Sequence, residues 1–409
     1  MLMEFAYNIC ELPRRKRFFL SVQEGELPKI PVVFVLGAPL PSRAANAVQT
    51  TQMAAALANL GVPTSLVCWL ESDEEDVFSY YGLPANFSLI SISNLGRRRG
   101  FRSVAIITAL VRRFGRRWIC HTRIPSVAMM ASWLGVPTVF ELHSIPIQPT
   151  QRRFLPLLAK APGLRRVVVI SQALHQVIEA EYPSIARRPI VVAHDAVDVA
   201  RFAIPESREE ARRQLGLPEA VTIVGYTGRL SPGKGVHTLL AAASGASFTT
   251  CIVGGNPDDP SDLLYKYREE YQSPEIIFVG HQPPAKIPLY LRAFDIVVAP
   301  FTREPVSQFT VKGKALAYDI SGVMSPLKIF EYMASSTPMV VSDLPVLREV
   351  LVPGETAVMI PPADPQALGQ ALHQLIRDTS RANGLSERAR EMVHSYTWEA
   401  RAWNIFAGL

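Results

Sequence analysis

The sequence predicts an α/β protein built from two doubly wound, Rossmann-like domains, and three observations support this prediction. The chain has 409 residues, 48% of them hydrophobic, which is enough to fill two cores of ordinary size. Short continuous apolar runs alternate with helical patterns, as is typical of parallel sheets covered on both faces. The same succession begins twice, at residues 31–36 and again at residues 221–226.

The first half opens with a strand, a loop and a helix. Residues 31–36 form an apolar run, a loop follows to Arg43, and a helix is expected from near Ala44 to Gly61. The loop contains no G-x-G-x-x-G pattern, which argues against a nicotinamide dehydrogenase. Two later predicted strands end in polar residues, at His121 and at His143. Open α/β sheets bind their ligands at such carboxyl ends.

The second half opens with a glycine-rich loop that enters a helix. It runs Thr227-Gly-Arg-Leu-Ser-Pro-Gly-Lys-Gly235 and contains Arg229 and Lys234. Glycine lets a backbone approach a ligand closely, and two cations at a helix start suit a diphosphate. The alternative is a solvated turn without a ligand.

A second helix start lies at Ser325-Pro-Leu-Lys-Ile-Phe-Glu-Tyr-Met-Ala334. Ser325 reads as the N-cap, with proline at the first helical position, and Thr337-Pro338 ends the helix. Glu331 is a fixed acceptor suited to two neighbouring ribose hydroxyls. Alternatively, it forms an ion pair with Lys328 on a solvated face.

This segment, with Thr337-Pro-Met-Val-Val-Ser-Asp-Leu-Pro-Val-Leu-Arg-Glu349 after it, resembles the donor-binding motif of family 4 glycosyltransferases. These are retaining, nucleotide-sugar-dependent enzymes of the GT-B fold, in which two Rossmann-like domains face a central cleft. The family motif usually has two glutamates separated by seven residues. Here the first position is Val323, so the glutamate associated with the donor sugar is missing. A sub-branch with the Ser-Pro-Leu-Lys form shows the same departure.

The resemblance implies a role for each candidate site residue. Catalytic roles fall to a histidine that follows Glu141 and to the two cations of the glycine-rich loop: His143, Arg229 and Lys234. Donor nucleotide and phosphate binding falls to Arg229, Lys234, Ser325, Leu327, Lys328 and Glu331. Cleft or acceptor candidates are Arg43, Asn46, His121, Arg123 and Glu141. Purely structural roles remain open for the histidines and for Arg43 and Asn46. The resemblance implies no cofactor besides the donor and no metal.

The resemblance also implies the domain limits. Residues 1–30 form an N-terminal extension, 31–198 the acceptor-side domain, 199–385 the nucleotide-sugar domain, and 386–409 a helix that crosses back. The segment 301–323 is longer than the family usually allows and is either a lid or a surface excursion. His194-Asp195 stands where the family usually has Asn-Gly.

The function expected is retaining sugar transfer from a nucleoside-diphosphate sugar, by a front-face displacement without a covalent intermediate. Two alternatives stay open. One is a GT-B sugar-nucleotide epimerase. The other is a non-catalytic nucleotide-binding module, for which Val323 is the best support.

The charge is unevenly distributed. The net charge is +6 overall, but residues 97–188 hold 16 basic residues against three acidic ones, a net +13. This imbalance indicates an anionic partner, either a membrane surface or an anionic or lipid-linked acceptor; solubility alone is the alternative. No nucleic-acid partner is expected. Four scattered cysteines and the lack of a signal-peptide pattern favour a cytoplasmic protein, peripheral on the membrane face.

Overall fold

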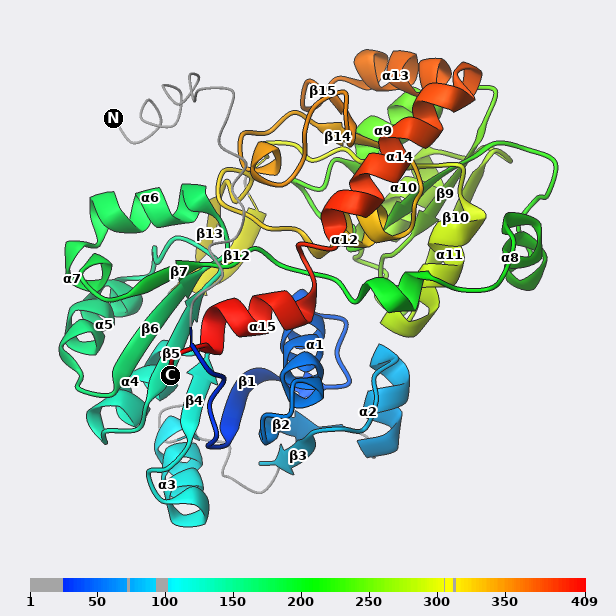
Figure 1. The fold of residues 1–409 in the computed structure, drawn as a ribbon. Coiled ribbons are helices and arrows are strands. Elements are labelled where there is room, and N and C mark those ends of the chain that lie inside the picture. The colour runs from blue at the N-terminus through cyan, green and yellow to red at the C-terminus, as the bar shows by residue number, and fades with distance from the viewer. Residues whose placement is uncertain (1–24, 72–73, 93–101, 305, 312–313) are drawn as a thin grey trace.

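Two parallel β-sheets organise the chain (Figure 1). The computed structural model describes residues 25–71, 74–92, 102–304, 306–311 and 314–409. The first sheet has the strand order β3-β2-β1-β4-β5-β6-β7, and the second has the order β10-β9-β8-β11-β14-β15. Within each sheet every neighbouring pair is parallel. Both orders place the first strand of the unit in the middle, so the prediction of two doubly wound sheets is confirmed.

The strands of the first sheet are β1 (Val32–Leu40), β2 (Thr64–Leu70), β3 (Ser88–Ser91), β4 (Ile119–Thr122), β5 (Thr138–Leu142), β6 (Leu164–Val169) and β7 (Ile190–Val192). Its helices are α1 (Ala45–Asn59), α2 (Glu74–Tyr81), α3 (Arg102–Phe114), α4 (Pro125–Trp133), α5 (Pro149–Lys160), α6 (Gln172–Glu181) and α7 (Pro183–Ala186). Alternate residues of β1 enter two different cores, Val32 and Phe34 on one face and Val33 and Val35 on the other. Helices cover both faces, and this explains why the strand reads as a continuous apolar run.

The strands of the second sheet are β8 (Ile223–Thr227), β9 (Thr249–Val253), β10 (Ile276–Gly280), β11 (Ile296–Ala299), β14 (Met339–Ser342) and β15 (Val358–Ile360). Its helices are α8 (Arg208–Leu215), α9 (Val236–Ala243), α10 (Leu263–Glu270), α11 (Ile287–Ala293), α12 (Leu327–Ala334), α13 (Pro365–Arg377) and α14 (Thr379–Val393). Short 3-10 turns occur at η1 (Val199–Phe202), η2 (Pro284–Lys286) and η3 (Leu347–Glu349).

The last helix, α15 (Trp398–Phe406), packs against α1 in the first unit (Figure 1). Trp398 and Phe406 belong to the core beneath β1, whereas Val393 at the end of α14 belongs to the second core. The chain thus crosses back after Val393, and the boundary expected at residue 386 falls inside α14. Beside this crossing, the amide of Val197 donates to the Tyr396 carbonyl at 3.0 Å, so the two connections lie together.

The long segment before α12 contains an antiparallel hairpin, β12 (Val306–Val311) and β13 (Lys314–Tyr318), which joins neither parallel sheet. Residues 1–24 of the expected N-terminal extension lie outside the described residues. The part that follows packs on the first unit through Leu27 and Ile30. Of the helices described, none has the length and apolar character needed to cross a bilayer.

Candidate active site

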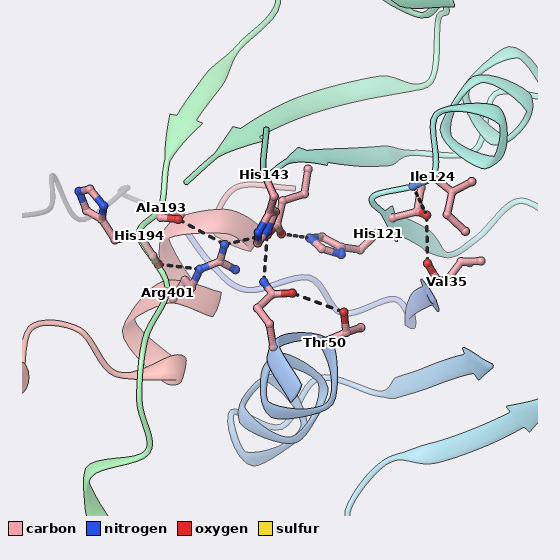
Figure 2. Close-up of polar contacts among 11 residues, drawn as sticks. Val35, Thr50, His121, Ile124, His143, Ala193, His194 and Arg401 are labelled. Atoms are coloured by element: carbon pink, nitrogen blue, oxygen red, sulfur yellow. Dashed lines mark hydrogen bonds and ion pairs between the residues drawn. The ribbon is translucent and has the colours of Figure 1, made fainter. Parts of the chain in front are cut away.

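A buried carboxylate, Glu141 near the end of β5, is the centre of a polar cluster in the first sheet (Figure 2). Its Oε1 accepts hydrogen bonds from Gln49 Nε2 on α1 and from Arg401 on α15, each at 2.9 Å. His143 also contacts Oε1, and His121 Nε2 lies 2.9 Å from Oε2. Contacts from α1, from the ends of β4 and β5 and from the C-terminal helix α15 therefore fix the Glu141 side chain, and this residue is only 1% exposed.

The charges in this cluster are set by burial and by arginine. Burial alone would raise the pKa of Glu141, but Arg401 and His143 outweigh that effect and hold it well below its usual value. Burial and the nearby positive charge of Arg123 lower the pKa of His143 to about 3, so its ring is neutral near pH 7. An ionised carboxylate only accepts hydrogen bonds, so Nε2 of this neutral ring must carry the hydrogen that faces Glu141. Nδ1 is then left with a lone pair that can accept from a hydroxyl.

The carboxyl ends of β1, β4 and β5 surround a cavity of about 280 Å³. Five of the predicted site residues line it together: Asn46, His121, Arg123, Glu141 and His143. They come from the start of α1 and from two strand ends that are distant in sequence but adjacent in the sheet. The cavity is therefore the place where these polar groups converge.

Arg43 does not join this cavity. Its guanidinium forms an ion pair with Asp258 at 2.9 Å and contacts the side chain of Asn256. Both partners follow β9 of the second sheet, so Arg43 connects the two units. This contact accounts for an arginine at that position without any ligand.

The glycine-rich loop after β8 packs its backbone against neighbouring strands. Gly235 precedes α9 with φ +66°, and a Cβ there would lie 1.6 Å from the Pro300 carbonyl oxygen, so only glycine fits. Gly228 has φ +128°, and a Cβ there would lie 3.0 Å from Lys328 Nζ. The loop is thereby held close to the start of α12.

Three cations gather where this loop meets α12. Lys328 Nζ lies 3.7 Å from the centroid of the Tyr226 ring and 5.5 Å from that of Phe301, and Lys234 Nζ lies 5.1 Å from the latter. The Lys328 ammonium is buried and has no hydrogen-bond partner among the described residues. Arg229, at the exposed end of the loop, is close enough to act on Lys234 electrostatically.

The charged forms of both lysines are disfavoured here. Burial and Arg229 lower the pKa of Lys234 to about 8, and burial and Lys234 lower the pKa of Lys328 far below its usual value. An anion placed among these groups would offset their repulsion and accept the hydrogen bonds that Lys328 lacks. The arrangement has the chemistry of a phosphate site.

The motif helix begins one residue later than expected. Pro326 is the N-cap of α12, so the N-cap assignment of Ser325 is wrong. The reason is a competing partner: Ser325 Oγ accepts a hydrogen bond from the Asp195 amide at 2.8 Å, across the two units. Leu327 is partly buried against the first core.

Glu331 lies on α12 and is partly exposed. Among the described residues it makes no ion pair, and Lys328 is buried, which does not support the surface pairing considered above. Burial raises the pKa of Glu331, and Arg201 and Lys328 partly counteract that shift. Its carboxylate oxygens therefore remain available as acceptors.

Val323, at the position of the missing glutamate, is turned toward the first unit. It packs in the same apolar cluster as Leu142 and Ile170, and its carbonyl accepts from Ser171 Oγ at 2.9 Å. The segment that precedes the motif helix thus forms part of the contact between the units.

Sequence reasoning missed four residues of this site. Gln49 and Arg401 hold Glu141, and Asp195 is buried with its Oδ1 unpaired within the described chain. Glu349, in η3, accepts from the amides of Gln172 and Ala173 at 2.7 and 2.9 Å, at the start of α6. Only Gln49 had a usable signal, because it follows Asn46 by three residues and so shares its helix face.

Two protein-family models match the chain. The one described as "Glycosyl transferases group 1" matches residues 221–378, and the one described as "Glycosyltransferase Family 4" matches residues 47–201. Together they extend over most of both units. A D-inositol 3-phosphate glycosyltransferase from Corynebacterium urealyticum is 28% identical over 244 residues, which is 55% of this chain and 51% of the relative. The chain spans about half the length of the curated relatives it matches.

Solved structures share the architecture at low identity. Sucrose-phosphate synthase from Thermosynechococcus elongatus superposes with a TM-score of 0.67 at 20% identity, covering 91% of this chain and 96% of that one. Anabaena HepE in complex with UDP-glucose gives 0.68 at 18% identity, covering 92% and 98%. This likeness confirms the expected GT-B fold. With this fold and two family models across its halves, the chain belongs to family 4, the group 1 glycosyltransferases.

Proposed function

We propose that the chain transfers a sugar from a nucleoside-diphosphate sugar to an acceptor bound in the cavity beside Glu141, with retention of anomeric configuration. The observation that supports this most is the cation cluster of Arg229, Lys234 and Lys328. In this cluster the buried ammonium of Lys328 has no hydrogen-bond partner among the described residues. Structural similarity to HepE, which was solved in complex with UDP-glucose, is in keeping with a sugar nucleotide as the ligand.

In this proposal the donor lies along the second unit. The diphosphate binds the three cations, which offset the charge it gains as the glycosidic bond breaks. Glu331, a partly exposed acceptor on α12, binds the ribose hydroxyls. Ser325 and Leu327 shape the loop that leads into the helix.

The acceptor side contributes positioning. Glu141 is the one carboxylate among the residues that line the cavity, and both its oxygens have close neighbours. It is thus poorly placed to attack an anomeric carbon. This favours a front-face displacement, in which the acceptor proton passes to the leaving phosphate. Neutral His143 would accept a hydrogen bond from a sugar hydroxyl through Nδ1.

One experiment tests the assignment against its two rivals. The protein is incubated with UDP-, GDP- and ADP-sugars, and thermal stability, donor hydrolysis or transfer, and sugar epimerisation are measured. We expect stabilisation by one nucleotide class, followed by transfer or slow hydrolysis. Epimerised donor would favour the epimerase. Stabilisation without any turnover would favour a binding module.

We further propose that the protein associates with an anionic membrane through the amino edge of the first sheet. The connections entering β4 to β7 lie side by side at this edge. They carry exposed cations, namely Arg112, Arg113, Arg116, Arg117, Lys160, Arg165 and Arg187. Trp133, Leu134 and Leu157 are exposed among them, at 52%, 42% and 48%. Aromatic and apolar anchors within a basic surface are typical of peripheral membrane binding.

Within residues 102–188, the acidic residues near this edge are Glu179 and Glu181, at the end of α6. They do not offset seven cations. Arg97, Arg98 and Arg99 of the basic stretch lie outside the described residues.

A further inference from the structure

We propose that the acceptor carries a phosphate and that Arg123 binds it in the cavity beside Glu141. This inference rests on the proposed function, because it names the acceptor class of that same site. The residue follows β4 directly and lines the cavity with His121 and His143.

Arg123 is partly exposed at the cavity and differs in its contacts from buried arginines such as Arg401 and Arg212. Arg401 donates to the His194 carbonyl at 2.8 Å and to Glu141 at 2.9 Å. Arg212 donates to three backbone carbonyls and to Asp295. Arg123, by contrast, makes no hydrogen bond or ion pair with any residue in the described part of the chain. A guanidinium has five donors in a planar fork that matches carboxylate and phosphate, so these unpaired donors at the cavity wall are available to an anionic ligand.

The nearest carboxylates do not fill this role. Glu141 is already held by Arg401, Gln49 and the two histidines, and it acts on Arg123 only through space. Asp195 also acts from a distance, and burial raises its pKa to about 7, which leaves it only partly ionised at neutral pH. With Glu141 offset by Arg401, Arg123 leaves a net positive charge at the cavity.

The remaining lining indicates the rest of the acceptor. At about 280 Å³, the cavity lies just below the range of roughly 300–1,000 Å³ typical of drug-sized ligands, so it suits one ring-sized unit. Asn46, Thr50, Ser144 and Gln151 supply uncharged donors and acceptors suited to hydroxyls. The acceptor inferred is thus a small polyol with one phosphate group, either a free molecule or the headgroup of a lipid.

The test compares paired acceptors that differ only in a phosphate: inositol and inositol phosphate, glucose and glucose 6-phosphate, glycerol and glycerol 3-phosphate. Vesicles containing phosphatidylinositol form a separate arm that distinguishes a headgroup from a free acceptor. Wild type, Arg123→Met and Arg123→Lys are compared by calorimetry with the donor nucleotide present. Arg388→Met, an exposed arginine on α14 outside the site, is the matched control.

We expect wild type and the control to bind at least one phosphorylated acceptor about 10–100-fold more tightly than its neutral partner, as charge-assisted hydrogen bonds allow. Arg123→Met should abolish that preference, and Arg123→Lys should retain part of it. The lysine variant keeps the test open if the methionine variant is unstable. The inference is overturned if no phosphorylated probe is preferred by wild type, or if Arg123→Met keeps the preference.

Donor binding is measured separately in each protein, because Arg123 lies on the acceptor side. Normal nucleotide-sugar binding without a phosphate preference would refute this inference alone. Loss of nucleotide-sugar binding in wild type would refute the proposed function itself.

Discussion

Replacing Lys328 with methionine should weaken donor binding without a large loss of stability. The Lys328 ammonium is buried without a hydrogen-bond partner in the described chain, next to a second cation at Lys234. An unsatisfied buried polar group costs roughly 1–3 kcal/mol, and methionine keeps the length of the stem while removing the charge. The contact with the Tyr226 ring at 3.7 Å, worth about 0.5–2 kcal/mol, is lost as well. The two effects together place the ligand-free variant between about 1 kcal/mol less stable and about 2.5 kcal/mol more stable than wild type.

Donor affinity should fall in the same variant. A charge-assisted hydrogen bond to a diphosphate is worth about 1.5–3 kcal/mol, which corresponds to roughly a 10- to 150-fold weaker Kd. Urea unfolding without ligand gives the stability, and calorimetric titration with the nucleotide that stabilises wild type gives the affinity. Lys266→Met, which removes an exposed lysine on α10, is the control and should change neither quantity.

The reasoning would be refuted by the reverse result. If Lys328→Met lost more than about 1 kcal/mol of stability and kept donor affinity within about twofold, Lys328 would be a packing residue. An anion site would then have to be sought elsewhere in the second unit.

Three further predictions concern charge at other positions. Lys234 should lose its proton near pH 8 in the free protein, so donor affinity should fall above that pH. Lys234→Arg should remove this pH dependence because arginine stays charged, and calorimetry from pH 7 to 9 measures the donor affinity of both proteins. Glu331→Gln should weaken nucleotide binding more than folding. Replacing the ribonucleotide by its 2′-deoxy form should reduce affinity less in the variant than in wild type, and equal reductions would show that Glu331 does not bind the ribose. Liposome flotation should show binding to anionic but not to zwitterionic vesicles, and both raised salt and the triple variant Trp133→Ser, Leu134→Ser and Leu157→Ser should weaken that binding. Binding that does not depend on lipid charge would refute the proposed membrane association.

The pKa of Lys234 also determines how the stability of the protein changes with pH. Because the folded-state pKa of Lys234 lies below its ordinary value, the folded protein binds fewer protons than the unfolded chain between about pH 8 and the ordinary lysine range. Stability should therefore rise with pH in that window while donor affinity falls. Lys234→Arg should remove the fall in donor affinity and reduce the rise in stability, because the lowered pKa of Lys328 still contributes to that rise.

Local sequence signals predicted the parts of this molecule that depend on local order. The apolar runs of β1 and β8 and the glycine-rich loop after β8 were identified because strand burial and tight turns leave short, regular patterns. The carboxyl ends of β4 and β5 could be paired for the same reason, since parallel strands bring His121 and His143 to one edge.

The parts that failed depend on contacts between distant segments. Arg401 meets Glu141 only because α15 returns to the first unit, 260 residues away in sequence, and no periodicity marks that contact. Ser325 resembled an N-cap, but a backbone amide from the other unit competes for its hydroxyl. The ion pair of Arg43 with Asp258, in the loop after β9 of the other unit, is likewise marked by no local pattern.

The contacts between the units explain how donor and acceptor sites can act together. Val323 and Ser325, immediately before the donor helix, are bound to Ser171 and Asp195 of the first unit. Glu349 in η3 accepts the first free amides of α6, which a helix start offers to an anion. The loop that leads into the cation cluster is therefore held by the same unit that contains the cavity. Under the proposed function, these contacts between the units would fix the position of the donor groups relative to the cavity beside Glu141.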